Sequence, residues 1–362
     1  MEQRIYNFSA GPATLPLPVL QKAQEELLAY PGAGASVMEI SHRSKAFAGI
    51  LERAKEDIKN LLQLTDSHRI LFAPGGATMQ FSMLALNFLQ GGSADYIMTG
   101  SWASKAMNEA KKHGAPRAAW SGKDENYVRM PKSSELDLDP KAAYVHFTSN
   151  ETIQGTEFFE EPEVGDVPLF CDASSDFMSR PIPIGKYALI YAGAQKNVGP
   201  SGMAVVILRE DLLERVPEGL PSLLDYKVMV ENDSLYNTPS TFTIYMIGLV
   251  MRWLREDVGG LEKMADINRA KAKLIYDVID NSGGFYRGHA VPECRSLMNV
   301  TFRLPSEDAE KEFIAQATKA GLDGLKGHRS VGGCRASIYN AMPVAGCEAL
   351  RDFMVEFRRA KG

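Results

Sequence analysis

The chain has 362 residues, of which 45% are hydrophobic and 23% charged. This ordinary globular composition excludes collagen-like, disordered and low-complexity chains, and the length predicts two domains or one large domain with an appendage. The net charge of −5, without any block of basic residues, argues against a nucleic-acid-binding protein. Any anionic ligand must therefore be bound by a few local groups.

The cysteines and the apolar runs indicate in which cellular compartment the protein is expected. The four cysteines, Cys171, Cys294, Cys334 and Cys347, form neither a CxxC pair nor a disulfide-dense framework. The opening residues show no signal-peptide pattern, and the longest strongly apolar run, Ile244 to Met251, is too short to span a membrane. We therefore expect a cytoplasmic protein without a membrane partner. The scattered histidines and the lack of HExxH or EF-hand motifs predict no metal site.

In chain order, a Pro-rich opening precedes two predicted helices, over residues 17–30 and 46–64, the second with apolar residues at three-and-four spacing. The Gly-rich stretch between them carries His42 and Arg43 in a predicted loop. From residue 70, short apolar runs alternate with amphipathic stretches: ILFA, MQFSMLALNFLQ, DYIMT, WASKAMNEAKKH, AAYVHF, PLFCDAS, ALIYAGAQK and MAVVILR. This alternation predicts a mostly parallel sheet wrapped by helices, with ligands beyond the carboxyl ends of the strands.

The C-terminal third predicts a second, smaller unit. Residues 240–281 are predicted to form two helices broken near Gly259 and Gly260, and strand–helix alternation resumes from about Gly284. We predict an N-terminal segment over 1–16, a large cofactor-binding domain over 17–258 and a small C-terminal domain over 259–362, with the N-terminal segment packing on the small domain.

Lys196 is the most informative residue, within YAGAQKNVGPSG between two strand-like runs. Small neighbours let a planar ligand approach, and a sheltered lysine loses pKa and becomes an amine nucleophile. Alone, such a lysine is more simply a solvated residue of a Gly-rich turn. Three more features at presumed strand ends favour a pyridoxal phosphate site: Asp172 for the pyridine nitrogen, the Gly75-Gly76 turn opening a helix for the phosphate, and Trp102 to stack on the ring.

In these motifs the chain resembles the class V aminotransferases of fold type I, nearly from end to end. The resemblance is carried by NFSAGPATLP at 7–16, SHRS at 41–44, GGATMQF at 75–81, GSW at 100–102, SNETIQGTEF at 149–158, YNTPST at 236–241 and GHRSVGGCRAS at 327–337. The last motif and the His-Arg pairs mark the branch that acts on a phosphorylated amino acid. The implied fold is α/β: a large domain built on a mostly parallel seven-stranded sheet flanked by helices, and a smaller C-terminal α+β domain.

The resemblance also implies the cofactor and its contacts. Pyridoxal 5′-phosphate is expected as a covalent Schiff base on Lys196, with Asp172 at the pyridine nitrogen and Trp102 stacked on the ring. Further cofactor contacts are implied for Ala77, Thr78, Thr152 and Gln195, and, from the partner subunit of a homodimer, for Asn237 and Thr238.

Two separated basic groups match a substrate with two anionic ends, because arginine suits bidentate capture of carboxylate and phosphate. The resemblance implies Arg335 at the α-carboxylate, and His328 and Arg329, with His42 and Arg43 from the neighbouring subunit, at the phosphate. Some members carry an arginine where this chain has Thr78. Phosphate recognition is therefore expected to depend more on His328 and Arg329.

The implied activity is reversible ping-pong transfer of the amino group from L-glutamate to 3-phosphohydroxypyruvate, giving O-phospho-L-serine and 2-oxoglutarate in serine biosynthesis. In some bacteria the same branch accepts 3-hydroxy-2-oxo-4-phosphooxybutanoate in pyridoxine biosynthesis. The nearest alternative is another class V enzyme, such as a serine–pyruvate or alanine–glyoxylate aminotransferase, which would not need two basic groups. Less favoured are a cysteine desulfurase using Cys334, a non-catalytic cofactor-binding protein, and a nicotinamide-dependent oxidoreductase, for which the GxGxxG fingerprint is missing.

Overall fold

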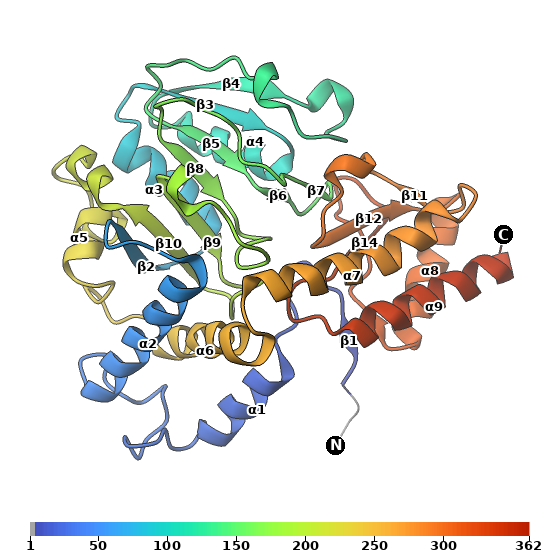
Figure 1. Cartoon of the computed structure of the whole chain (residues 1–362), viewed down its shortest axis with the longest axis horizontal. Helices are drawn as coiled ribbons and strands as arrows, with labels where there is room; N and C mark the ends of the chain where they lie inside the picture. Colours follow the sequence, from blue (N-terminus) through green and yellow to red (C-terminus); the bar gives the residue numbers. More distant parts are fainter. Residues whose placement is uncertain (1–3, 362) are drawn as a thin grey trace.

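The computed structural model describes residues 4–361, so residues 1–3 and 362 of the predicted terminal segments lie outside the described residues. Two bodies stand side by side (Figure 1): a larger one around a seven-stranded sheet and a smaller one around a three-stranded sheet. Helix α7 (Leu261–Asp280) leaves the larger body and runs along the smaller one. The predicted fold class, α/β with a mostly parallel seven-stranded sheet, is confirmed.

The large sheet is buried on both faces. Its strand order is β2 (His68–Pro74), β10 (Met203–Arg209), β9 (Leu189–Gly193), β8 (Leu169–Asp172), β5 (Val145–Thr148), β3 (Ser93–Met98) and β4 (Ala115–Ser121). Strand β10 is antiparallel to both of its neighbours, and the other pairs are parallel. Because side chains alternate along a strand, Val205 of β10 joins one core with α2 (Lys45–Leu62) and α6 (Thr241–Arg252), whereas Val206 joins the opposite core with α3 (Ala77–Phe88).

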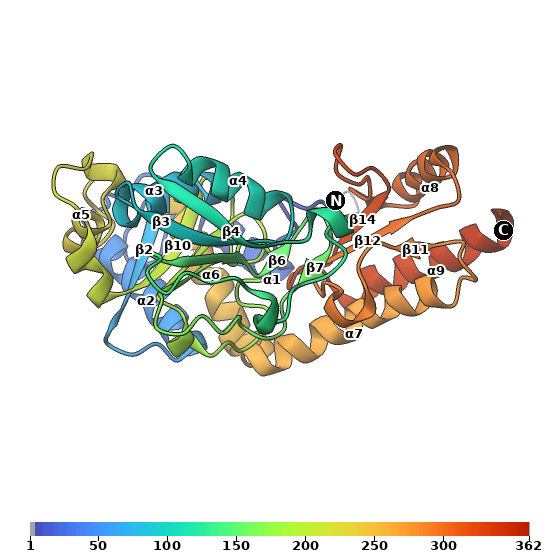
Figure 2. The same ribbon diagram turned by 90° about the horizontal axis from the view of Figure 1, so that it is seen from above.

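The smaller body packs helices on both faces of its sheet. Strands β11 (Arg287–Gly288), β12 (Asn299–Arg303) and β14 (Cys334–Ser337) are antiparallel. Figure 2 shows α7 and α9 (Val344–Lys361) on one side of these strands and α8 (Glu307–Lys319) on the other. The N-terminal strand β1 (Tyr6–Asn7) pairs in parallel with β13 (Leu322–Asp323), which carries Phe8 into the same core. The start of the chain is thus tied to the smaller body.

The two bodies join at an irregular helical segment. Helix α6 passes into a π-helical turn over Trp253–Val258, and Gly259 and Gly260 follow with φ of 89° and 102°. Both positive φ values favour glycine, and the two glycines end the turn before α7 begins. The predicted helix break near Gly259 and Gly260 falls at this point, and the domain boundary between residues 258 and 259 stays a prediction.

Some element limits differ from the predictions. The helix predicted over 17–30 is shorter and ends at Glu26 as α1 (Leu17–Glu26); Pro31 disfavours helical backbone only at Tyr30, the last residue of the predicted range. Strand β4 was not predicted: it is a partly exposed edge strand with Pro116 near its start, so it shows no apolar run. Further elements, besides several short 3-10 helices, are α4 (Ser101–Ala110), β6 (Asn150–Glu151), β7 (Thr156–Glu157) and α5 (Tyr226–Glu231).

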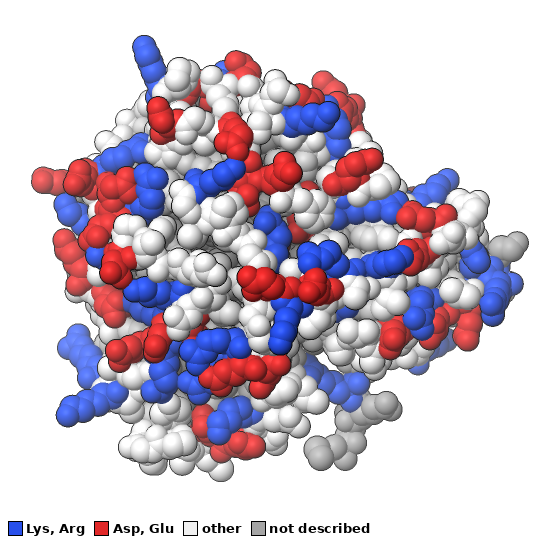
Figure 3. Space-filling view, viewed as in Figure 1, with Lys and Arg blue, Asp and Glu red and all other residues white. Residues whose placement is uncertain are grey.

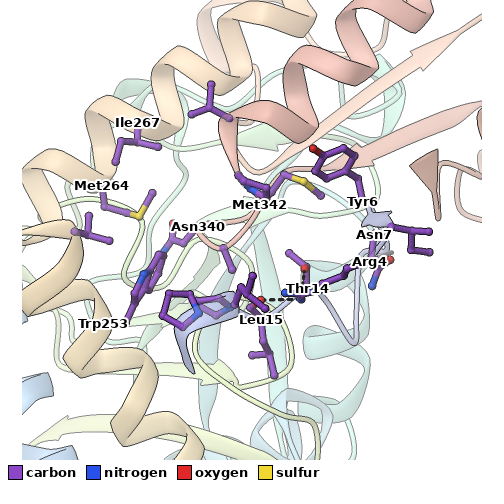
Figure 4. Close-up of a pocket in the computed structure, with 18 residues that line it drawn as sticks. Arg4, Tyr6, Asn7, Thr14, Leu15, Trp253, Met264, Ile267, Asn340 and Met342 are labelled. Carbon is purple, nitrogen blue, oxygen red and sulfur yellow. Dashed lines mark hydrogen bonds between the residues drawn. The ribbon is translucent and has the colours of Figure 1, made fainter. Parts of the chain in front are cut away.

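A mainly apolar cavity of about 490 Å³ lies where the N-terminal segment meets both bodies (Figure 4). Trp253, Met264 and Met342 contribute to its walls, and Arg4 at one side donates to Thr14 Oγ1 and to the Leu15 carbonyl. None of the predicted site residues lines this cavity. This cavity lies between packed parts of the structure and is separate from the cavity that holds Lys196.

Candidate active site

The carboxyl ends of six strands meet at one edge of the large sheet. Strands β2, β9, β8, β5, β3 and β4 point the same way, because the chain direction reverses on both sides of β10. Beyond these ends lie Gly75 after β2, Lys196 after β9, Thr152 after β5 and Trp102 after β3, while Asp172 is the last residue of β8. This is the edge at which open α/β sheets bind ligands.

A cavity of about 630 Å³ opens at this edge. Nine of the predicted site residues line it: Ala77, Thr78, Trp102, Thr152, Asp172, Gln195, Lys196, His328 and Arg335. Gly11 of the N-terminal segment contributes as well. The walls therefore come from the large sheet, the start of the chain and the smaller body together.

Lys196 lies at the centre of the charged groups in this cavity. Its Nζ donates a 2.6 Å hydrogen bond to Thr152 Oγ1 and lies 5.3 Å from the centre of the Trp102 ring. Burial lowers the pKa of Lys196 to about 8, although the negative charges of Asp172 and Glu151 oppose this shift. At pH 7 roughly a tenth of the amine is therefore unprotonated, far more than for an exposed lysine, and the unprotonated amine is the nucleophile.

Asp172 is held by the turn that follows β8. Its Oδ1 accepts from the Ser174 amide at 3.0 Å and from Ser174 Oγ at 2.6 Å, and Ser174 Oγ in turn accepts from the Gly193 amide at 3.0 Å. Burial raises the pKa of Asp172, while the positive charge of Lys196 and the Ser174 donors act in the opposite direction. One carboxylate oxygen is thus fixed by the protein, and the side chain is oriented in the cavity wall.

An uncapped helix start forms another wall. Helix α3 begins at Ala77, directly after Gly75 and Gly76, whose φ values of 96° and 144° suit glycine. Within residues 4–361 no side chain caps this helix, and its first turn holds no acidic residue. Backbone N–H groups at such a helix start suit an anion, particularly a phosphate. Thr78 is exposed here and adds no charge.

The opposite wall is basic. Arg335 on β14 donates to the Thr152 carbonyl at 3.3 Å, and its Nε is buried without a hydrogen-bond partner in the described part of the chain. Within residues 4–361 no carboxylate forms an ion pair with Arg335. Burial and the positive charges of Arg335, Lys105 and Arg329 lower the pKa of His328. Positive charge without a counter-charge in this half-buried wall favours an anionic ligand.

Five predicted site residues do not line the cavity of this single chain: His42, Arg43, Asn237, Thr238 and Arg329. Arg329 is exposed on the loop beside His328. The other four lie in two surface stretches, and the resemblance assigns them to the neighbouring subunit of a dimer. Figure 3 shows basic and acidic side chains interspersed over the face in view, so no single-sign field covers that face.

A family model, curated relatives and solved structures match this chain over nearly its whole length. The family model of class-V aminotransferases matches residues 5–350. The phosphoserine aminotransferase of Desulfosudis oleivorans is 55% identical over 100% of both chains. The solved phosphoserine aminotransferase of Bacillus circulans subsp. alkalophilus superposes with a TM-score of 0.97 at 52% identity over 100% of both chains. The pyridoxal-phosphate-bound phosphoserine aminotransferase of Trichomonas vaginalis superposes with a TM-score of 0.92 at 41% identity, over 97% of this chain and 100% of that one.

This chain belongs to the phosphoserine aminotransferase family of the class-V aminotransferases. The family and the aminotransferase activity predicted from the sequence are confirmed. The family also argues against a nicotinamide-dependent oxidoreductase, because the full-length relatives are aminotransferases.

The structure of this aminotransferase disfavours the desulfurase alternative directly. Cys334 lies in β14 with 2% of its surface exposed, and burial raises the pKa of its thiol. A thiol that is both buried and protonated is a poor nucleophile. Within residues 4–361 there is no group of three or more His, Cys, Asp or Glu that could bind a metal, and none of the helices there has the length and apolarity to cross a bilayer.

Three residues of the aminotransferase site were missed by sequence reasoning. Ser174 orients Asp172, Glu151 accepts hydrogen bonds from the backbone of α4, and Lys105 Nζ lies 4.0 Å from the centre of the Trp102 ring. Local signals existed: Ser174 is two residues after Asp172, and Lys105 is one helical turn after Trp102. Glu151 is adjacent to Thr152, but its contact with α4 is long-range and leaves no local pattern.

Proposed function

We propose that this chain catalyses reversible transfer of an amino group from L-glutamate to 3-phosphohydroxypyruvate, giving O-phospho-L-serine and 2-oxoglutarate. The observation that carries the proposal is the gathering of Lys196, Asp172 and Trp102 in one cavity opposite Arg335, a cation without a carboxylate partner in the described residues. The names of the full-length relatives support the choice of substrate. In organisms that make pyridoxine by the related route, 3-hydroxy-2-oxo-4-phosphooxybutanoate would be a second substrate.

The residues of the cavity fit pyridoxal 5′-phosphate. Lys196 would bind it covalently through Nζ, and Asp172 would hold a proton at the pyridine nitrogen. Trp102 would cover one face of the ring, while Thr152 Oγ1, now bonded to Lys196 Nζ at 2.6 Å, would meet the phenolic oxygen. The phosphate would lie at the start of α3, bound by Ala77, Thr78 and Gln195, with Asn237 and Thr238 from the partner subunit.

Catalysis by these residues is mainly proton movement and orientation. When bound, pyridoxal phosphate supplies an electron sink that stabilises negative charge at the substrate Cα. Lys196, once released by the incoming amine, would take the proton from the substrate Cα as a general base and, as a general acid, deliver it to the cofactor carbon that carried the aldehyde. Its lowered pKa, about 8, suits both directions of transfer near neutral pH. Asp172, anchored by Ser174, keeps the pyridine nitrogen protonated.

Binding at the two ends of the substrate would give specificity. Arg335 would bind the α-carboxylate common to both amino acids as a bidentate pair. His328 and Arg329 would bind the phosphate, together with His42 and Arg43 from the partner subunit. An alanine–glyoxylate or serine–pyruvate aminotransferase, the alternative in this family, needs no such second basic group.

A homodimer with shared sites is part of the proposal. Apolar side chains are exposed next to the residues assigned to the partner: Leu28 at 86% and Met38 at 58% precede His42, and Tyr236 at 52% precedes Asn237. Large exposed apolar side chains in neighbouring stretches favour a subunit interface. The four cysteines are all free and buried, which favours a reducing, cytoplasmic setting.

The absorbance spectrum of the purified protein tests the proposal. We expect a visible band from the lysine-bound cofactor that disappears on addition of O-phosphoserine or glutamate and persists with alanine. Absence of the band after pyridoxal phosphate is supplied would refute the cofactor assignment. Equal loss of the band with alanine and phosphoserine would instead favour the alternative, less selective aminotransferase.

A further inference from the structure

Glu151 is a buried carboxylate that caps a helix from a distant part of the chain. Its side chain has 0% exposure, and its two oxygens accept from the backbone amides of Trp102 at 3.0 Å and Ala103 at 2.9 Å. Helix α4 begins at Ser101 after Gly100, which has no side chain to cap it. A carboxylate at a helix start satisfies free N–H groups and interacts favourably with the helix dipole. Glu151 thus anchors the turn that carries Trp102.

Gly100, directly before α4, leaves room for the contact between Glu151 and this helix. Gly100 has a φ of 173°, an extended value open to any residue, so conformation does not require glycine there. A Cβ at Gly100 would, however, lie 2.7 Å from both Glu151 Cγ and Gln154 Oε1. Gln154 Oε1 also accepts from the Ser101 amide at 3.3 Å. Gly100 therefore leaves the space that Glu151 and Gln154 occupy.

The same carboxylate contributes to the charge balance around Lys196. The groups that act on Lys196 are Asp172 and Asp176 of the β8 end, Glu151, and Arg335 of β14. Burial raises the pKa of Glu151 to about 7, while the amides of Ala103 and Trp102 and the charge of Lys196 oppose this rise. Two N–H donors, one to each oxygen, favour the ionised form.

We propose that Glu151 is a positioning residue, which holds Trp102 against the cofactor ring through α4 and whose buried charge stabilises the cationic form of the Lys196 nitrogen. The inference rests on the proposed function for the roles of Lys196 and Trp102. It adds a residue that touches neither cofactor nor substrate: Glu151 acts through the backbone of α4 and through the field at Lys196.

The Glu151→Gln variant tests both parts. The amide nitrogen cannot accept an N–H, so one of the two hydrogen bonds is lost together with the charge. In the holoenzyme, we expect the pH midpoint of the visible band to fall by about 0.5 unit or more, because the protonated nitrogen loses a favourable charge. We also expect pyridoxal phosphate to bind about tenfold more weakly, as one contact of ~1.4 kcal/mol would give.

Glu157→Gln is the matched control. Glu157 is also a buried glutamate with a raised pKa, and it accepts from the Leu297 amide at 2.7 Å, but within residues 4–361 it accepts no hydrogen bond from α4. Loss of a buried carboxylate in general would lower the thermal stability of both variants, whereas only Glu151→Gln should move the pH midpoint. An unchanged midpoint in Glu151→Gln, or equal shifts in both variants, would overturn the inference.

Two further variants keep the test decisive. If Glu151→Gln does not fold, Gly100→Ala displaces the carboxylate while retaining its charge, and we expect weaker cofactor binding there too. Glu151→Asp retains charge on a shorter side chain, so it should restore most of the pH midpoint but not the cofactor affinity. Normal affinity in Gly100→Ala and Glu151→Asp would refute the positioning role. A Glu151→Gln variant that binds pyridoxal phosphate with an unshifted midpoint contradicts this inference alone, whereas absence of the band in the wild-type protein contradicts the proposed function.

Discussion

Lys196 Nζ and Thr152 Oγ1 are joined by a 2.6 Å hydrogen bond, although the residues lie 44 positions apart. The strands that precede them, β9 and β5, are separated in the sheet by β8, whose last residue is Asp172. The bond therefore crosses the end of β8, and the Lys196 amine, the Thr152 hydroxyl and the Asp172 carboxylate line the same cavity. Parallel order of these three strands is what brings the groups together.

Replacing Lys196 with alanine should leave the fold intact and abolish the reaction. The side chain supplies the covalent link and the base for the proton shift, so the visible band should vanish and turnover should fall at least ~10³-fold. Lys186→Ala, which removes an exposed lysine paired with Glu163, is the control and should keep both. Normal turnover in Lys196→Ala would contradict the assignment.

The rate at which the apoprotein captures pyridoxal phosphate should depend on pH through Lys196. Only the neutral amine attacks, so the rate should rise with pH and level off above a midpoint near pH 8, since burial lowers the pKa of Lys196 to about 8 from 10.5. The unfolded chain binds this proton more strongly, so the contribution of Lys196 to apoprotein stability should also increase between about pH 8 and 10.5. Stopped-flow absorbance measures the first effect; a midpoint near 10.5 would contradict it.

Substituting Asp172 with asparagine should slow the reaction without preventing cofactor binding. The variant loses the charge that keeps the pyridine nitrogen protonated, so single-turnover rates with phosphoserine should fall by about 10²–10⁴-fold. Ser174→Ala keeps the charge of Asp172 but removes the 2.6 Å hydrogen bond to it, together with the bond that Ser174 Oγ accepts from the Gly193 amide, and should cost about tenfold or less. Equal losses in the two variants would mean that orientation, and not charge, is the contribution of Asp172.

The two basic groups should separate the substrates. Arg335→Ala should raise KM for glutamate and for phosphoserine alike, because both carry an α-carboxylate; loss of a bidentate ion pair costs about 10–100-fold. His328→Ala and Arg329→Ala should impair phosphoserine more than glutamate. Half-reactions followed by absorbance measure each substrate separately, and equal losses for both in the last two variants would exclude the phosphate role.

Lys271 should be a large contributor to stability in the smaller body. It is fully buried on α7, and its Nζ donates to the carbonyls of Ile338 at 3.0 Å, Tyr339 at 2.7 Å and Met342 at 3.2 Å. Lys271→Met would remove these three hydrogen bonds, leaving the Tyr339 carbonyl only the Met342 amide as a donor, and should lower the free energy of unfolding by about 3 kcal/mol. Lys273→Met, on the same helix but exposed and paired with Asp277, should cost less than about 0.5 kcal/mol. Urea unfolding of both variants provides the comparison, and similar losses would refute the prediction.

The chain's own pattern determined the class of fold and the chemistry at its strand ends. Alternating apolar runs and amphipathic stretches depend on local periodicity, which burial on both faces of a sheet imposes directly on the sequence. The Gly-rich turn before α3, Asp172 and Lys196 were found in this way, because each follows an apolar run. The residue roles and the dimer came from resemblance and stay predictions.

Only the tertiary structure determined the strand order and the long-range contacts, because neither leaves a periodic pattern in the local sequence. The antiparallel direction of β10 depends on how the strands are ordered in space. So does the place of β4 at the edge of the sheet, and Pro116 near the start of β4 leaves no apolar run that would predict a strand. The same holds for the contact of Glu151 with α4, formed between residues 48 and 49 positions apart. Neither helix propensity nor hydrophobic pattern encodes such a contact, since a buried carboxylate is stabilised by donors that folding alone brings to it.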